Sequence, residues 1–346
     1  MVQHRTSDLQ ARVRPADGPG RRASGVATLV LIAAIALGFA AASVHAQPSF
    51  PNRPIRVVSP FPAGAVSDIS LRILADRVGA RLNTQMIVQN QPSGGGVVAA
   101  REALSAPADG YTLALLSNAT AVSAALFKHL PFDPLADFVP VSGMSDFAYL
   151  FLTNYQSNLH ALADFLAAAR AKPGTMNVGT SDAGTTPYLT ALRFKKAAGV
   201  DFTIVPFHGA SELTVALLRN DVDVVINAYG AYRQSLADKQ LRAIATTTAG
   251  RSAFLPDVPT MQEAGVPNFE VSSWNGIFAS AHTPAPVVDR LAQEIRAALA
   301  EPDLARKFHD LGIEVWPAAG AELSARMRSE IGRWNRVVDE AGIERQ

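Results

Sequence analysis

The fold is decided by residues 53–69, which read RPIRVVSPFPAGAVSDI. The run at residues 55–58, which is rich in β-branched residues, predicts a short strand. Prolines and a glycine then predict a tight loop, and apolar residues at helical spacing from Ile69 to Val78 predict a helix. The unit therefore reads strand, tight loop, helix.

Units of the same kind follow along the chain. Further strands are expected at residues 86–88, 111–116, 150–152, 176–178, 202–205, 222–226, 241–245 and 271–279. Helical patterns lie between them, and two amphipathic helices are expected at residues 286–300 and 320–341. Strands that alternate with helices predict an α/β fold with a mostly parallel sheet covered on both faces.

The order of these units predicts two lobes in a chain of 346 residues. We expect residues 47–148 together with residues 272–346 to form lobe 1, and residues 149–271 to form lobe 2. The chain then crosses between the lobes twice. Two crossovers make a hinge, and the cleft beside a hinge is a natural ligand site.

The first 46 residues differ from the rest. Arginines up to Arg21 and Arg22 precede the apolar run 26–42, and residues 44–46 are small enough for cleavage. We expect a signal peptide at residues 1–46 and export. Two alternatives stay open: the run from residue 26 to 44 is long enough for a membrane anchor, and the arginine pair fits twin-arginine export.

Composition excludes several classes of function. The chain has no cysteine, so it has neither a Cys nucleophile nor thiolate metal ligands. Removal of residues 1–46 takes away five arginines and two aspartates, which leaves 26 basic and 28 acidic residues. That balance gives no reason to expect nucleic acid as a partner.

Three loops between a strand and a helix combine small residues, hydroxyls and glycine. Their candidate ligand-binding residues are Phe61, Pro62, Ala63, Gly64, Ala65, Asp68, Ser117, Asn118, Ala119, Thr120, Thr180, Ser181, Ala183, Gly184, Thr185 and Thr186. Such loops expose backbone N–H groups at the positive end of a helix, where they bind carboxylate or phosphate. The alternative is that these residues only cap helices. Three such loops, in both expected lobes, favour an anion site.

Three single residues have two interpretations each. Asp68 is either a first-turn carboxylate that stabilises its helix or a cleft group that selects an ammonium or hydroxyl on the ligand. His208 follows the strand at residues 202–205 and is either a ligand contact or a solvated loop residue. Trp274 is expected to pack in the core rather than to form a ligand platform.

Signatures of enzymes are missing or incomplete. Gly94, Gly96 and Ala99 resemble a dinucleotide fingerprint, but the acidic residue expected about twenty positions later is absent. Residues 179–183 lack the closing glycine of a nucleophile elbow, and no histidine pair has metal-ligand spacing. We expect no catalytic residue, cofactor or metal, with an exported hydrolase of small esters as the alternative.

Ten short motifs follow one another along the chain, each at one position. They are RPIRVVSPFPAG at 53–64, NQPSGGG at 90–96, PADGYTL at 107–113, LPFDP at 130–134, KPG at 172–174, VPFHG at 205–209, LPDVPT at 255–260, EAG at 263–265, WNG at 274–276 and TP at 283–284. These motifs resemble the Bug receptors, the substrate-binding proteins of tripartite tricarboxylate transporters. The resemblance covers essentially all of the chain after residue 46.

The resemblance implies a type II periplasmic binding protein, with two βα lobes joined by a two-strand hinge. It implies a periplasmic monomer that holds a small organic carboxylate by backbone amides and hydroxyls, with Pro206, Phe207 and Gly209 lining the far wall. The implied partners are the membrane subunits of a tripartite transporter. Such receptors also occur without an evident transporter, so an orphan ligand sensor is an alternative.

Three departures from the family fall in the expected pocket. Ala65 stands where a second glycine is usual, Tyr188 near the place of a histidine, and Phe207-His208 in place of Tyr-Lys. A histidine in place of a lysine weakens any fixed positive charge at neutral pH. We therefore expect a ligand with one carboxylate that is aromatic or uncharged elsewhere.

Overall fold

The computed structural model describes residues 50–182 and 185–345. The predicted signal peptide, and the site candidates Ala183 and Gly184, lie outside the described residues. Within those two ranges, no helix combines the length and the apolar composition that a membrane crossing requires.

One mixed sheet runs through the described part of the chain, in the order β2-β1-β3-β9-β4-β7-β5-β6, with β8 and β10 also paired to β4. Its strands are β1 (Ile55–Ser59), β2 (Met86–Asn90), β3 (Thr112–Ser117), β4 (Phe138–Asn154), β5 (Asn177–Ser181), β6 (Thr203–Phe207), β7 (Val224–Ala228), β8 (Leu241–Thr246), β9 (Ser272–Ser280) and β10 (Glu314–Val315). The pairs β1·β2, β1·β3, β5·β6 and β5·β7 are parallel, as the alternation of strands and helices predicts. The prediction of a mostly parallel sheet is wrong, because β9 pairs antiparallel with β3, and β4 pairs antiparallel with β7, β8, β9 and β10.

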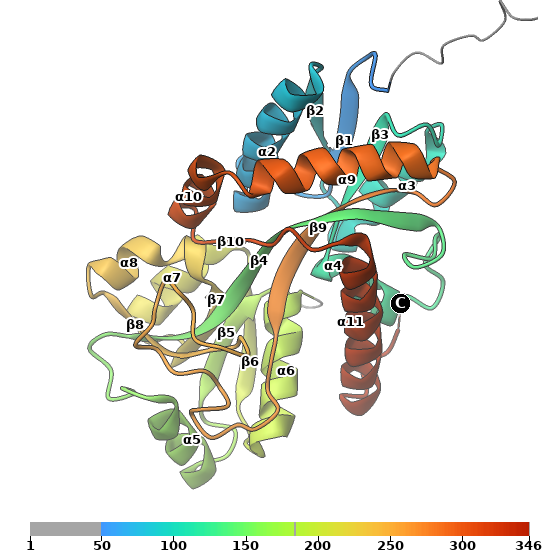
Figure 1. The fold of residues 1–346 in the computed structure, drawn as a ribbon. Coiled ribbons are helices and arrows are strands. Elements are labelled where there is room, and N and C mark those ends of the chain that lie inside the picture. The colour runs from blue at the N-terminus through green and yellow to red at the C-terminus, as the bar shows by residue number, and fades with distance from the viewer. Residues whose placement is uncertain (1–49, 183–184, 346) are drawn as a thin grey trace, which may run out of the picture. The chain divides into compact units, whose positions relative to one another are not determined.

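Helices cover both faces of the sheet (Figure 1). They are α2 (Val66–Leu82), α3 (Val97–Ser105), α4 (Asn118–Leu126), α5 (Leu162–Ala171), α6 (Thr186–Ala198), α7 (Ala210–Leu218), α8 (Arg233–Ala237), α9 (Ala285–Leu299), α10 (Pro302–Asp310) and α11 (Gly320–Glu340). Two 3-10 turns, η1 (Gly94–Gly96) and η2 (Tyr229–Ala231), complete the described elements. Helix α3 thus follows η1 after the carboxyl end of β2, and α4 begins directly after the carboxyl end of β3.

Strand β4 connects the two halves of the sheet. Its residues from Phe138 to Ala148 pair with β9, ending on the pair of Ala148 and Ser272. From Tyr149 onward it pairs instead with β7 and β8. Figure 1 shows β4 and β9 running side by side between the two halves. The predicted lobe boundaries fall at this change of partner, and they stay a prediction.

One buried apolar cluster runs through both halves, from Ala114 and Phe138 to Phe151 and Phe194, and each half also has a smaller cluster of its own. In lobe 1, β1, β3, α2 and α9 enclose Val57, Leu71, Leu115 and Ile295, all buried. In lobe 2, five phenylalanines gather, with the rings of Phe151 and Phe194 4.8 Å apart. Each such ring contributes about 2–3 kcal/mol on burial. This packing fixes the strand ends from which the loops between the halves begin.

Candidate functional site

A cavity of about 540 Å³ is lined by residues of both predicted lobes. From lobe 1 come Phe61, Gly95, Ser117, Ala119, Ser123, Leu126, Phe127, Phe147 and Ser273; from lobe 2 come Tyr149, Ser181, Asp182, Thr185, Thr186, Pro187, Asn227 and Ala228. Its size is in the usual range for a small-molecule site. It lies at the carboxyl ends of parallel strands, where α/β proteins usually bind ligands.

The Phe61 loop is held in place by a buried carboxylate. Asp68 is 1% exposed, and it accepts hydrogen bonds from the Gly64 N–H at 2.9 Å and from Asn90 Nδ2 at 2.7 Å. Asn90 Nδ2 also donates to the Phe61 carbonyl at 3.0 Å. Arg72 donates to Asp68 at 3.1 Å. Phe61 is therefore fixed on the cavity wall by side chains from β2 and α2.

These bonds also set the charge of Asp68. Burial alone would raise its pKa, but the hydrogen bonds from Arg72, Asn90 and Gly64 outweigh burial and lower that pKa. Asp68 is thus a carboxylate whose oxygens bond to groups of its own lobe, and it does not line the cavity.

The N-terminus of α4 forms the second part of the lobe 1 wall. Ser117 caps the helix, because its hydroxyl accepts from the Ala119 N–H at 3.2 Å while its own N–H donates to Thr120 Oγ1 at 3.4 Å. Gly95, with φ of 64°, packs against this helix so closely that an added Cβ would lie 1.5 Å from Ser123 Oγ. A glycine is therefore required at this place in the wall.

The N-terminus of α6 faces the same cavity from lobe 2. Thr185 donates through its hydroxyl to the Asp182 carbonyl at 2.7 Å, and Pro187 lies in the first turn. First-turn N–H groups have no partner inside the helix, and they carry the positive end of its dipole. Two helix N-termini, one from each lobe, thus border one cavity.

A buried hydrogen bond joins these two helix ends. Asn118 is fully buried, and its Nδ2 donates to Thr186 Oγ1 at 2.9 Å. Its Oδ1 accepts from Trp334 Nε1 on α11 at 3.1 Å. Asn118 therefore ties α4 to lobe 2 while α11 fixes its orientation.

Tyr149 lines the cavity where β4 changes its pairing partners. Burial raises the pKa of Tyr149 to about 12, against smaller opposing effects of the Ser273 and Thr186 hydroxyls. The phenol therefore stays protonated at physiological pH. It offers the cavity a neutral O–H group that can donate a hydrogen bond.

Some predicted site residues reach this cavity and others do not. Those that line it are Phe61, Ser117, Ala119, Ser181, Thr185 and Thr186. The described candidates outside its lining are Pro62, Ala63, Gly64, Ala65, Asp68, Asn118, Thr120, Thr180, Pro206, Phe207, His208 and Gly209. Of these, Asp68, Asn118, Thr120 and Thr180 are buried. Trp274 is also fully buried, as the packing interpretation predicts.

Several lining residues were not predicted, namely Gly95, Ser123, Leu126, Phe127, Phe147, Tyr149, Asp182, Pro187, Asn227, Ala228 and Ser273. Asp182 lies inside the predicted loop at residues 180–186. Asn227 and Ala228 end strand β7, and Tyr149 and Ser273 lie at the two crossovers. Strand ends and crossovers were thus the available signal for four of these eleven residues.

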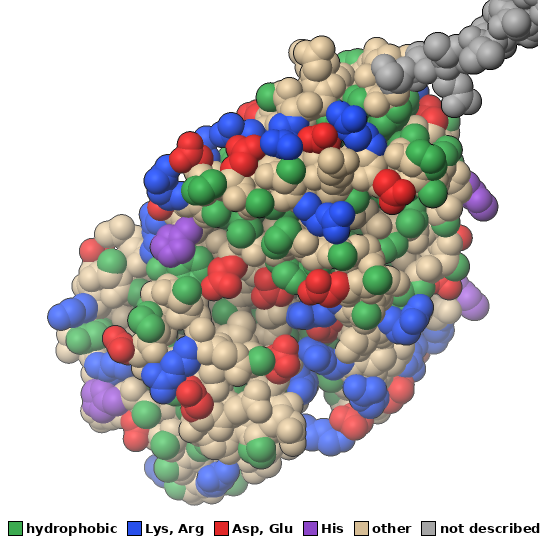
Figure 2. Space-filling model, in the orientation of Figure 1, with side chains coloured by type: hydrophobic (Ala, Val, Ile, Leu, Met, Phe, Trp, Pro, Cys, Tyr) green, Lys and Arg blue, Asp and Glu red, His purple; other side chains and the backbone are tan. Residues whose placement is uncertain are grey.

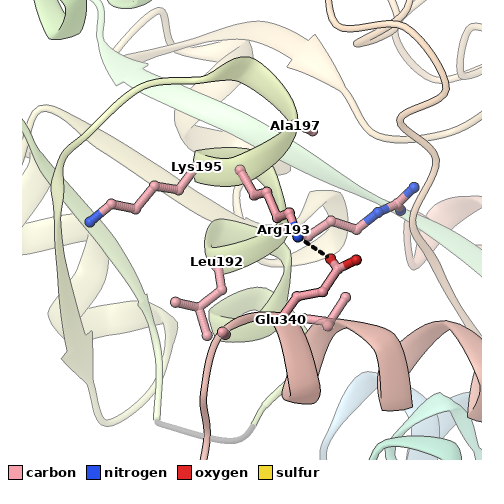
Figure 3. A pocket seen from close by; sticks show the side chains of 8 residues that line it. Leu192, Arg193, Lys195, Ala197 and Glu340 are labelled. Atoms are coloured by element: carbon pink, nitrogen blue, oxygen red, sulfur yellow. Dashed lines mark ion pairs between the residues drawn. The ribbon is translucent and has the colours of Figure 1, made fainter.

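A second cavity, of about 590 Å³, lies between α6 and α11 (Figure 3). An ion pair of Lys196 and Glu340, 2.9 Å apart, bridges the two helices there. Its lining comes from residues 192–197 of α6 and from the end of α11. The basic side chains of this lining already have partners: Lys195 pairs with Asp201, Lys196 pairs with Glu340, and Arg193 donates to the backbone carbonyls of Asn268 and Glu270. Carbonyl groups at the helix C-termini also disfavour anions, so this cavity suits a carboxylate less well.

The described residues contain no group of three or more His, Asp or Glu side chains that could hold a metal ion. On the face drawn in Figure 2, acidic and basic side chains are intermixed. That face presents no field of one sign for a polyanionic partner.

Comparison with known proteins agrees with this architecture. Residues 70–343 match the family described as the tripartite tricarboxylate transporter family receptor. The chain belongs to this family. It is 31% identical over 317 residues to protein BugT of Bordetella pertussis, which covers 90% of this chain and 97% of BugT. The resemblance to the Bug receptors is therefore confirmed.

Two solved structures place the fold. MatC from Rhodopseudomonas palustris with bound malate is 31% identical, with a TM-score of 0.71 over 84% of this chain and 100% of MatC. R. palustris Rpa4515 with adipate is 29% identical, with a TM-score of 0.75 over 85% of this chain and 99% of the neighbour. The predicted α/β fold of a type II periplasmic binding protein is confirmed. The chain is a solute-binding protein of the periplasmic TctC and Bug type, and not an enzyme.

Proposed function

We propose that the interlobe cavity captures a small metabolite that carries a carboxylate. The observation that carries this proposal is the pair of helix N-termini, of α4 and α6, bordering a cavity whose described lining includes no Lys or Arg side chain. Backbone N–H groups and hydroxyls then supply the positive potential, as they do at other anion sites at helix ends. Malate and adipate in the two neighbouring structures support a carboxylate ligand.

The residues that we propose as ligand contacts are those predicted residues that line the cavity, joined by Tyr149 and Ser273. Tyr149 contributes a neutral donor, and Ser117, Ser181, Thr185 and Thr186 contribute hydroxyls. The loop at residues 206–209 would then contact a ligand only after further closure of the lobes.

Capture requires that the ligand binds one arrangement of the lobes better than another, because equal affinity would shift nothing. The division into residues 47–148 with 272–346 and residues 149–271 provides the two bodies. The hydrogen bond of Asn118 with Thr186, at 2.9 Å, joins the two bodies. It stabilises the arrangement in which the N-termini of α4 and α6 both border the cavity.

We further propose that the protein is exported, cleaved after Ala46, and delivers its ligand to the membrane subunits of a tripartite transporter. Family membership supports this assignment. An orphan sensor would use the same binding step but no transporter. Deletion of the receptor gene separates the two: uptake of the ligand by the cells should be lost if the protein serves a transporter, and should be unchanged if it is a sensor.

N-terminal sequencing of the periplasmic protein tests the cleavage site. The sequence is expected to begin at Gln47.

The binding step is tested by a thermal-shift screen of the periplasmic protein against mono-, di- and tricarboxylates, amino acids and aromatic acids. One chemical class should raise the melting temperature in a saturable way, because a ligand of the folded state stabilises it. The ligand should be recovered unchanged after prolonged incubation. If only uncharged compounds raise the melting temperature, the proposal of a carboxylate site is wrong.

A further inference from the structure

Asp182 is the only charged side chain among the described residues that line the interlobe cavity. It follows strand β5 and precedes α6, so it lies on the lobe 2 wall. Its Oδ1 is 2.7 Å from Nδ1 of His208, and the two side chains are 54% and 86% exposed. A half-exposed carboxylate that belongs to the cavity lining is thus available to a bound ligand.

We propose that Asp182 selects the ligand class: one carboxylate, a flat apolar body, and an N–H or O–H donor that bonds to Asp182. This inference rests on the proposed function. An ionised carboxylate only accepts hydrogen bonds, and its charge repels a second carboxylate nearby. Dicarboxylates are therefore poor ligands of this chain, although the site belongs to a family in which relatives hold malate and adipate.

The apolar body is inferred from the rest of the lining. Phe61, Phe127, Phe147 and Tyr149 border the cavity, and the rings of Phe147 and Tyr149 meet edge to face at 6.3 Å. Aromatic edges and faces pack well against a planar ring. Leu126 and Pro187 add further apolar surface. An aliphatic dicarboxylate would leave this surface unused.

His208 has a defined role in this scheme. It holds one oxygen of Asp182 and leaves the other oxygen to the ligand. His208 is thus a positioning residue. Its removal leaves both oxygens of Asp182 open to the ligand and removes any positive charge of the imidazole beside them. The preference for an ammonium group should then increase rather than vanish.

The test uses two matched series of ligands in calorimetric titrations of the protein. The first is benzoate with hydrogen, aminomethyl or carboxylate in the para position. The second is 3-phenylpropionate with hydrogen, amino or carboxylate on the α-carbon. In at least one series the ammonium compound should bind about tenfold more tightly than the parent, and the dicarboxylate about tenfold more weakly, as expected for a charge-assisted bond and its loss.

Asp182→Asn should remove both differences, while His208→Ala should enlarge the advantage of the ammonium compound. The inference is overturned if the dicarboxylate binds as tightly as its parent in both series, or if Asp182→Asn leaves the order unchanged. If neither the wild type nor Asp182→Asn binds any carboxylate of the wider screen, the proposed function fails together with it. Binding with the wrong order overturns the inference alone.

Discussion

The two walls of the interlobe cavity are built in opposite ways. On lobe 1, the Phe61 loop and the α4 N-terminus are tied to buried groups, Asp68 and Asn118. On lobe 2, the lining residue Asp182 pairs with His208, and both are exposed. The difference indicates how such a receptor can combine two properties. One wall is held rigid by buried hydrogen bonds, and exposed residues on the other wall can differ between receptors and so determine which ligand binds.

The largest expected effect is on the rigid wall. Asp68→Ala removes the acceptor of three donors at a buried position, so we expect the free energy of unfolding to fall by about 2–4 kcal/mol. Urea unfolding measures this change. Asp109→Ala is the matched control, since it breaks the exposed pair with Arg53 at 2.7 Å and should change stability by less than about 1 kcal/mol.

The pH dependence of this effect has a definite sign. The pKa of Asp68 is lower in the folded protein than the ordinary value, so its ionised form stabilises the fold above the unfolded pKa of about 3.9. That contribution is lost as the pH falls through the folded pKa. The difference between wild type and Asp68→Asn should therefore shrink below about pH 4, and a constant difference would contradict this assignment.

A smaller effect is expected where the two walls meet. Asn118→Ala leaves Trp334 Nε1 without its partner and removes the bond to Thr186, which should cost about 1–3 kcal/mol. Thr186→Val removes this bond and the contact of the Thr186 hydroxyl with the Tyr149 phenol, but it leaves the bond from Trp334 in place, and it should cost about 1 kcal/mol. Equal losses in the two variants would mean that Trp334 does not depend on Asn118.

The crossover itself should respond to pH in the opposite sense. Burial raises the pKa of Asp146 on β4 to about 6, against the opposing charge of Arg326. Its neutral form is favoured in the fold, so the stability it contributes is present below about pH 4 and lost as the pH rises through 6. Relative to Asp146→Asn, the wild type should lose about 1–2 kcal/mol between pH 4 and pH 7. Thermal unfolding of both proteins measures the difference.

The smallest effect on stability is expected at the variable wall. Asp182→Ala and His208→Ala break an exposed pair, which should change the free energy of unfolding by less than about 0.5 kcal/mol. The same variants should change ligand preference. A stability loss as large as that of Asp68→Ala would show that the two walls are built alike.

Local patterns predicted much of the fold. The strand, loop and helix at residues 53–78 appear as β1, the Phe61 loop and α2, and the expected strand at 271–279 appears as β9 within one residue. The first half of β4 was not predicted. Pro140 and the polar residues Ser142, Ser145 and Asp146 interrupt its apolar alternation, and the register shifts between Pro140 and Ser142 and between Gly143 and Ser145.

The site was harder to predict than the fold. The three loops were found because their small and hydroxyl residues are local features. The tie between Asp68 and Asn90 joins residues 22 positions apart, and the bond of Asn118 to Thr186 joins residues 68 apart. Local sequence patterns do not predict such contacts, because these hydrogen bonds form only when the sheet brings separate strand ends together.

The central claim is that the ligand binds between the two walls and not between α6 and α11. Calorimetric titration of two cavity-filling variants with the carboxylate found in the screen tests it most directly. Ala119→Trp fills the interlobe cavity and should abolish binding, whereas Leu192→Trp fills the α6–α11 cavity and should leave affinity unchanged. Loss of binding in Leu192→Trp, with binding kept in Ala119→Trp and both proteins folded, would contradict the account.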